Sequence, residues 1–229
     1  MMKKKLVYLC TIVFTMSLLS SCNEEKATKD DLLGTWTLRS GSAMDIIWES
    51  SENISITGGV SLPTSTVAEL LVEYGNEQLS EELKSITFRK DNKVEFTYFD
   101  DDVNAWNTDV FGEYRVKSRK ELIYNPDVDK LLEGMDVDAT ALAGIKALAA
   151  TSGIPVKFTF IGPTAAQICF YLDTRTVKDM KVIFPILAAS ITGNSAQDII
   201  IRVLLEKLPE LLDKTDKVEI SLYFDKVLN

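Results

Sequence analysis

The side chains that could perform acid–base, nucleophilic or metal chemistry are unevenly represented in this chain. It has 34 Asp and Glu residues and three cysteines, but no histidine. Imidazole is the usual proton carrier of nucleophilic catalytic pairs and the commonest zinc or copper ligand. Its absence disfavours Ser-His and Cys-His enzymes and most zinc or copper proteins, so carboxylates and cysteines are the remaining candidates for chemistry.

The densest carboxylate cluster lies at residues 100–102. Calcium prefers oxygen ligands of this kind, and counting an EF-hand loop from Asp102 puts Glu113 at its twelfth position. However, Asn107 stands where this loop needs glycine, and Trp106 stands where it needs an oxygen ligand. We therefore interpret the cluster as a solvated hairpin loop, and we expect no metal ion and no cofactor.

Paired carboxylates can also hydrolyse glycosides when two of them face each other across a cleft. No spacing in this sequence identifies such a pair, so a carboxylate hydrolase is the weaker alternative and we expect no catalytic residue. Cys169 lies in the apolar run ICFYL at residues 168–172, which is typical of a small buried hydrophobe rather than a nucleophile.

The N-terminal residues have the pattern of an export signal. Three lysines at residues 3–5 precede an apolar run at residues 6–19. This run is shorter than the roughly 20 residues that span a bilayer, so a cleaved signal over residues 1–21 is favoured over an uncleaved anchor. Cleavage would leave 208 of the 229 residues and, because three lysines and no acidic residue are lost, would change the net charge from −9 to −12. Such an acidic chain repels phosphate backbones, so no nucleic-acid partner is expected.

The sequence LSSC at residues 19–22 resembles a bacterial lipobox, in which the cysteine becomes the acylated first residue. The resemblance implies lipidation of Cys22 and attachment to a membrane through the lipid. Residues 22–31 are polar and lack hydrophobic periodicity, which is typical of a flexible tether. The acidic pair at residues 24–25 resembles the surface-export signal of lipoproteins in the Bacteroides group. It implies an outer-membrane lipoprotein exposed at the cell surface, with a periplasm-facing protein as the alternative.

Hydrophobic periodicity predicts an alternation of strands and helical insertions. The predicted strands are residues 34–39, 85–89, 94–99, 110–117, 121–124, 155–161, 165–173 and 217–225. The predicted helical segments lie near residues 66–84, 128–152 and 176–213. Capping-box patterns at Thr66 and Thr176 predict helix N-termini, and Pro185 is expected to kink or split the last segment.

Three motifs occur in a suggestive order: Gly34-x-Trp36, a hairpin from Phe88 to Phe96 across an Asp-Asn turn, and Gly112-x-Tyr114. In this order they resemble the small lipocalin-like, calycin-type domains of Bacteroidetes lipoproteins. The resemblance implies an α+β fold in which one antiparallel lipocalin-like β-barrel with inserted helices occupies residues 32–229. It also implies that Trp36 closes the floor of the barrel.

Strand alternation points one face into this barrel, and nearly half of its residues are aromatic, which suggests either a lining for an apolar ligand or an ordinary core. The candidate lining residues are Trp36, Phe88, Phe96, Tyr98, Tyr114, Tyr124, Phe158, Phe160, Phe170 and Phe224. We expect a non-enzymatic lipoprotein that carries a small apolar or amphipathic ligand. The alternative is a surface module with a packed barrel that binds a glycan or a protein through its loops and helices. Trp48 and Trp106, expected in loops beside Asp and Asn, would suit a glycan.

Overall fold

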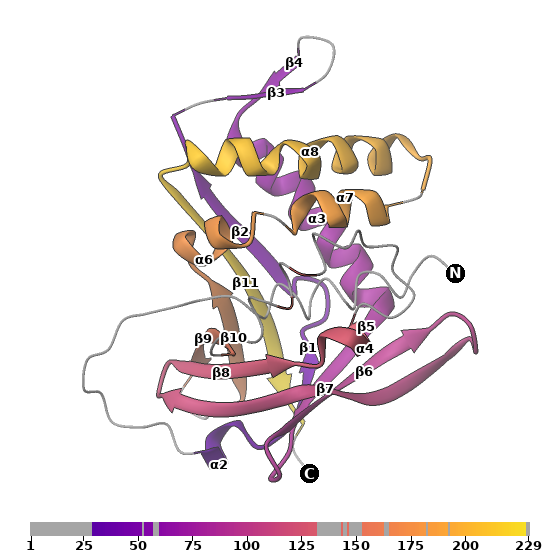
Figure 1. Cartoon of the computed structure of the whole chain (residues 1–229), viewed down its shortest axis with the longest axis vertical. Coiled ribbons are helices and arrows are strands. Elements are labelled where there is room, and N and C mark those ends of the chain that lie inside the picture. The colour runs from indigo at the N-terminus through magenta and orange to yellow at the C-terminus, as the bar shows by residue number, and fades with distance from the viewer. Residues whose placement is uncertain are drawn as a thin grey trace.

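Eight antiparallel strands close into a barrel in the computed structural model, and helices cover one end of it (Figure 1). The structure describes residues 29–51, 53–56, 60–131, 143, 146, 153–162, 165–181, 183–191 and 193–227. Neighbouring strands follow the order β1-β5-β6-β7-β8-β9-β10-β11, and β11 pairs with β1 to close the ring. The expected α+β fold, with an antiparallel lipocalin-like barrel and several helices, is confirmed.

The barrel strands are β1 (Gly34–Leu38), β5 (Leu83–Phe88), β6 (Lys93–Asp100), β7 (Ala105–Ser118), β8 (Glu121–Pro126), β9 (Ile154–Ile161), β10 (Gln167–Leu172) and β11 (Lys217–Lys226). The other strands are β2 (Met44–Glu49), β3 (Ile54–Ile56) and β4 (Val60–Leu62). The helices are α2 (Lys29–Leu32), α3 (Thr64–Glu82), α4 (Val128–Leu131), α6 (Thr174–Asp179), α7 (Phe184–Ser190) and α8 (Ala196–Asp213). Most of the helical segment predicted near residues 128–152 lies outside the described residues.

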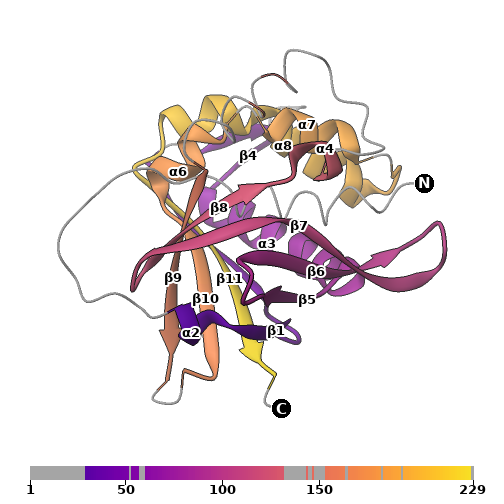
Figure 2. The same ribbon diagram turned by 60° about the horizontal axis from the view of Figure 1, so that its bottom comes forward.

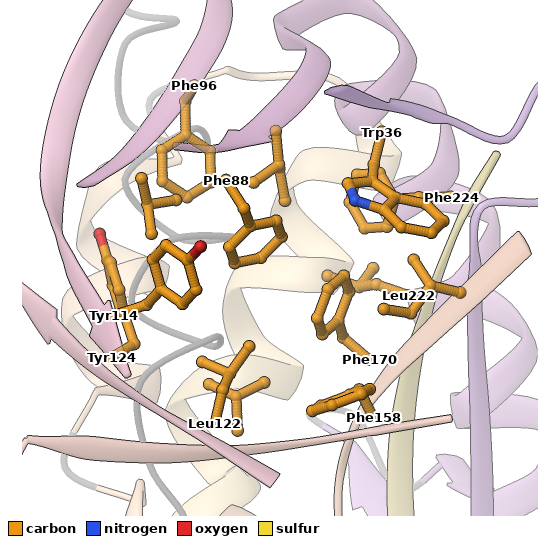
Figure 3. Close-up of a cluster of buried hydrophobic side chains, with 14 of the residues drawn as sticks. Trp36, Phe88, Phe96, Tyr114, Leu122, Tyr124, Phe158, Phe170, Leu222 and Phe224 are labelled. Carbon is orange, nitrogen blue, oxygen red and sulfur yellow. The ribbon is translucent and has the colours of Figure 1, made fainter. Parts of the chain in front are cut away.

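The barrel interior is filled by the apolar face of its strands. Strand β6 alternates strictly between half-buried and buried residues, as a strand with one face in a core should. Aromatic rings from different strands meet at the centre, where Phe170 contacts Phe88, Phe158 and Phe224 at ring-centroid distances of 5.8, 6.2 and 5.8 Å (Figure 3). The inward faces of these strands therefore follow side-chain alternation, except in β7, where a register shift places Phe111 inside.

The two ends of the barrel differ. Helix α2 lies at one end, where Leu32 is fully buried and its carbonyl accepts a 2.8 Å hydrogen bond from the Trp36 indole. Helices α7 and α8 lie at the opposite end (Figures 1 and 2). Residues 29–31, which the tether prediction included, form α2.

Strand β11 extends beyond the closed part of the barrel. One of its edges pairs first with β2, over Lys217–Leu222, and then with β1, over Phe224–Lys226. At Tyr223 the two partners meet, since Arg39 N donates to its carbonyl at 3.0 Å and Tyr223 N donates to the Ala43 carbonyl at 2.7 Å. Strands β1 and β2 are thus one long strand interrupted at residues 40–42, and β2 carries the sheet out under the helices.

Helix α3 is attached to the free edge of β2 through Asn76. The backbone N–H groups of Ala43 and Met44 both donate to Asn76 Oδ1 at 2.8 Å, and Asn76 Nδ2 donates back to the Met44 carbonyl at 3.1 Å. These bonds satisfy edge groups that would otherwise lack partners and place the helix across the strand.

The helix starts differ from two predicted caps and agree with the predicted effect of Pro185. Helix α3 begins at Thr64 after Pro63, which is the N-cap with an extended ψ of 149°, so Thr66 lies inside the first turn and the capping box predicted there is wrong. Helix α6 is capped instead by Asp173, which accepts from the backbone N–H of Thr176. Pro185 splits the third segment as expected and sits in the first turn of α7, where its missing N–H has no helical partner to lose.

Trp48 and Trp106 were expected in loops and instead lie in β2 and β7. The physical reason is pairing that local patterns do not reveal. Trp48 is paired with Val218 at the extended end of β11, and Trp106 is paired with Phe99 in a hairpin that continues β6 and β7.

Candidate functional site

The ten aromatic residues predicted to line a ligand cavity lie in or against the barrel core. Nine of them are buried and Phe160 is half-buried. Their polar atoms are used within the protein: Tyr114 donates to the Arg89 carbonyl at 3.1 Å, Tyr124 to the Phe111 carbonyl at 2.6 Å and Tyr98 to Asp109 at 2.9 Å. Figure 3 shows the labelled members of this set pointing toward one another. An eight-stranded barrel has an interior that side chains can just fill, and these residues fill it.

A separate apolar cavity of about 110 Å³ lies between the extended sheet and the helices. None of the ten predicted lining residues contributes to it. Its sheet wall comes from β2 and β11, with Met44, Ile46, Trp48, Val218, Ile220 and Leu222. Its helical wall includes Leu71, Tyr74 and Leu79 of α3, Val177 of α6, Phe184 and Leu187 of α7, and Ile201, Leu205, Leu208 and Leu212 of α8.

The wall of the cavity is almost wholly hydrocarbon. Among the lining residues that the structure describes, the polar side-chain atoms are the Tyr74 hydroxyl and the Trp48 indole nitrogen. The indole donates to Thr215 Oγ1 at 2.9 Å, so it needs no partner in the cavity. A space with this lining offers water few hydrogen bonds and therefore favours an apolar occupant.

One side of the cavity reaches toward the protein surface. Met44, Leu71 and Tyr74 are half-buried, whereas the opposite wall, with Leu212 and Val218, is buried. Gly75 brings α3 close to β2, since a Cβ added there would lie 2.5 Å from Met44 Sδ. A ligand could therefore enter along the edge between α3 and β2.

A polar group of residues adjoins this cavity where α3 and α8 are in contact. Burial raises the pKa of Tyr74 to about 12, and the negative charges of Asp198, Glu82 and Glu77 add to this, while the positive charge of Arg202 opposes it. The tyrosine hydroxyl is therefore protonated at neutral pH and available as a hydrogen-bond donor.

Arg202 is incompletely satisfied. Its Nη2 donates to the Gly193 carbonyl at 2.7 Å, but its buried Nε has no hydrogen-bond partner among the described residues. The nearby Asp198 carboxylate is engaged in the cap of α8, where Oδ2 accepts from the backbone and the hydroxyl of Ser195 at 3.1 and 2.6 Å.

The other candidate residues have contacts that indicate structural roles. In the run at residues 100–102, Asp100 accepts from Asp102 N at 3.0 Å and from Asn107 Nδ2 at 3.1 Å, which stabilises the hairpin turn. Within the part of the chain that the structure describes, no three Cys, Asp or Glu side chains gather closely enough to hold a metal ion. Cys169 is buried, and its burial raises the pKa of the thiol. None of the described helices is both long and apolar enough to cross a bilayer.

Sequence reasoning predicted several elements of the cavity wall without recognising the cavity. The predicted strand at residues 217–225 contains Val218 and Ile220 of this wall, and the predicted helical segment near residues 176–213 contains Leu208 and Leu212. The sequence patterns did not indicate which element packs against the apolar face of each of these segments. Nothing in the sequence around Arg202 distinguishes it from the other basic residues.

No family model matches the chain, and no curated protein or solved structure matches it. The resemblance to lipocalin-like domains of Bacteroidetes lipoproteins therefore stays a prediction.

Proposed function

We propose that this protein is a non-enzymatic, membrane-tethered lipoprotein that binds a small apolar or amphipathic ligand. The observation that carries the proposal is the apolar cavity of about 110 Å³ between the β2–β11 extension and helices α3, α7 and α8. The filled barrel acts as the rigid scaffold, and the ligand binds at its helix-covered end rather than in its lumen.

The size and the lining of the cavity fit an alkyl chain or a single ring. An apolar protein cavity of about 150 Å³ can stay free of water and take up benzene. The cavity here is smaller, about 110 Å³, so it can enclose only part of a longer chain, and the rest of such a chain would lie along the half-buried edge between α3 and β2. Contact with apolar walls on several sides would supply the affinity, because a ligand regains the packing contacts that an empty cavity lacks.

The proposed tether is lipidated Cys22. Only seven residue steps separate Cys22 from Lys29, the first residue of α2. At roughly 3.5 Å per extended residue, the barrel end closed by α2 would lie within about 25 Å of the lipid headgroups. The helix-covered end, with the cavity, lies at the opposite end of the barrel and would face away from the membrane.

The proposal is tested with the chain from residue 22 onward carrying Cys22→Ser, titrated with 1-decanol as a neutral apolar probe. Trp48 lines the cavity, so its fluorescence should report occupancy. Leu205→Trp, which fills the cavity, should abolish binding. Ile199→Trp on the same helix is the control, because Ile199 is 49% exposed and should leave binding unchanged.

Equal binding by the wild type and by Leu205→Trp would overturn the cavity as the site. Failure of the correctly folded wild type to bind either decanol or an apolar molecule from its native cells would overturn the carrier function. Comparison of native and denatured masses of the purified protein would detect a co-purified ligand.

One observation favours a second function, the binding of a glycan at the β6–β7 hairpin. Trp106 is 42% exposed and packs edge-on against Phe99 at 5.5 Å, which holds the ring in place. Lys84 Nζ lies 5.8 Å from the centroid of this ring and provides a hydrogen-bond donor for sugar hydroxyls beside the aromatic surface. Trp106→Ala should then abolish retention on immobilised glycans, and equal retention of this variant and the wild type would exclude the site.

A further inference from the structure

We infer that the ligand of the cavity is a single-chain carboxylic acid whose carboxylate is held by Arg202 and Tyr74. The inference rests on the proposed function and specifies its ligand class. The alkyl chain occupies the apolar space, and the charged group stays at the edge where α3 and α8 are in contact.

The position of Arg202 follows from the helix. It comes directly after Ile201 and three residues before Leu205, and both of these line the cavity. At about 100° per residue, Arg202 lies on the flank of the cavity-facing stripe of α8. Tyr74 of α3 indicates on which side of the stripe Arg202 lies. Tyr74 lines the cavity, and its pKa is raised mainly by burial, while the positive charge of Arg202 lowers it.

The chemistry of Arg202 calls for an acceptor. A buried donor without a partner is unfavourable, and Arg202 Nε is the buried side-chain nitrogen or oxygen atom that lacks one in the described structure. Within the described residues, the Arg202 guanidinium also forms no ion pair with a carboxylate. A carboxylate would supply the missing acceptor, and Arg binds this group strongly through charge-assisted hydrogen bonds.

Tyr74 would supply a second donor. Its hydroxyl is protonated at neutral pH because its pKa is about 12, and it makes no hydrogen bond within the described residues. The acidic residues around it, Asp198, Glu77 and Glu82, disfavour a ligand group with two negative charges. A carboxylate with one charge fits this edge better than a phosphate monoester.

The shape of the cavity fits one extended chain. Its wall follows β2 from Met44 to Trp48, about 13 Å at 3.3 Å per residue, and α8 from Ile201 to Leu212, about 16 Å at 1.5 Å per residue. A volume of about 110 Å³ holds the terminal part of such a chain, and the carbons next to the carboxylate would lie along the half-buried edge at Tyr74. The cavity suits an alkyl chain of medium length rather than a fused ring system, with its tail near Leu212.

The test compares decanoate with 1-decanol, which have the same chain length and different headgroups. Charge-assisted hydrogen bonds predict that the wild type binds decanoate about ten-fold or more tightly than decanol. Arg202→Gln should remove most of this difference by weakening decanoate binding, while decanol binding stays within about two-fold. Tyr74→Phe should weaken decanoate binding to a smaller extent.

Arg115→Gln is the matched control, because Arg115 is exposed on the outer side of β7. Circular dichroism and thermal unfolding of each variant would verify the fold. Equal affinity for both probes, unchanged by Arg202→Gln, would overturn the carboxylate site and leave the apolar carrier intact. Binding of neither probe by the folded wild type would instead overturn the proposed function itself.

Discussion

The indole of Trp36 donates a 2.8 Å hydrogen bond to the carbonyl of Leu32, and both side chains are fully buried. This contact joins the first barrel strand to the helix that precedes it and closes the barrel at the end opposite the cavity. The Trp36 ring also lies 5.9 Å from Phe160 and is covered by the Lys226 ammonium at 4.9 Å. Trp36 is therefore the central residue of the closed end.

Trp36→Ala should destabilise the fold by roughly 3–5 kcal/mol, because it leaves a large cavity and an unpaired carbonyl at Leu32. Denaturant unfolding measures this loss. Trp106→Ala, at an exposed tryptophan, should change the free energy of unfolding much less. A loss below about 1 kcal/mol for Trp36→Ala would contradict its structural role.

Asn76→Ala should cost about 1–3 kcal/mol, since it leaves edge groups of β2 at Ala43 and Met44 without their partner. It should also loosen α3 and increase hydrogen exchange at these two backbone amides. The exposed neighbour Glu77→Ala provides the reference. Unchanged exchange at both amides in the Asn76 variant would show that α3 does not depend on this contact.

The lowered pKa of Asp173 predicts that the protein loses stability in acid. Burial tends to raise its pKa, but the hydrogen bonds from Lys157 and from Thr176 outweigh this and hold the pKa below its usual range. A group whose pKa is lowered by folding stabilises the protein above its unfolded pKa and loses that contribution as the pH falls through the folded pKa. Between about pH 5 and pH 2, the wild type should therefore lose stability more steeply than Asp173→Asn, by about 1 kcal/mol.

Unfolding curves collected over this pH range would measure the effect. Asp45→Asn, which changes an exposed carboxylate on β2, is the control and should follow the wild type. Parallel pH profiles for the wild type and Asp173→Asn would refute the role assigned to the Lys157–Asp173 pair.

Cys169 should react slowly with thiol reagents in the native state, because the side chain is buried and its burial raises the pKa of the thiol. In a Cys22→Ser background, a disulfide-exchange dye should label it at the rate of unfolding. Ser42→Cys, at an exposed position, should react at once. Rapid native labelling of Cys169 would mean that β10 opens far more readily than its buried face suggests.

Several elements were predictable because their signals are local. Strand β6 shows alternation over its whole length, and the Asp91-Asn92 turn before it places Asn92 at φ 68°, a conformation that asparagine tolerates. The cap of α6 was not predicted, because the local pattern favoured Thr176. Asp173 becomes the cap because β10 ends at Leu172, directly before it. Phe111 was also missed as a core residue: the register shift of β7 next to Val94 puts it inside, and no alternation rule predicts such a shift.

The candidate site likewise has features that local sequence patterns predict and features that they do not. The sequence by itself determined which residues are apolar on one face of β11 and of α8, because that periodicity is a property of neighbouring positions along the chain. Only the tertiary structure decided that Phe224 packs inside the barrel, that Val218 and Ile220 face the helices and that Leu222 contributes to both the barrel core and the cavity wall. That division follows from the interruption between β1 and β2 opposite Tyr223, and it brings Arg202 and Tyr74, 128 positions apart, to the edge of one cavity. Contacts of such long range depend on how whole faces pack, and local patterns do not specify them.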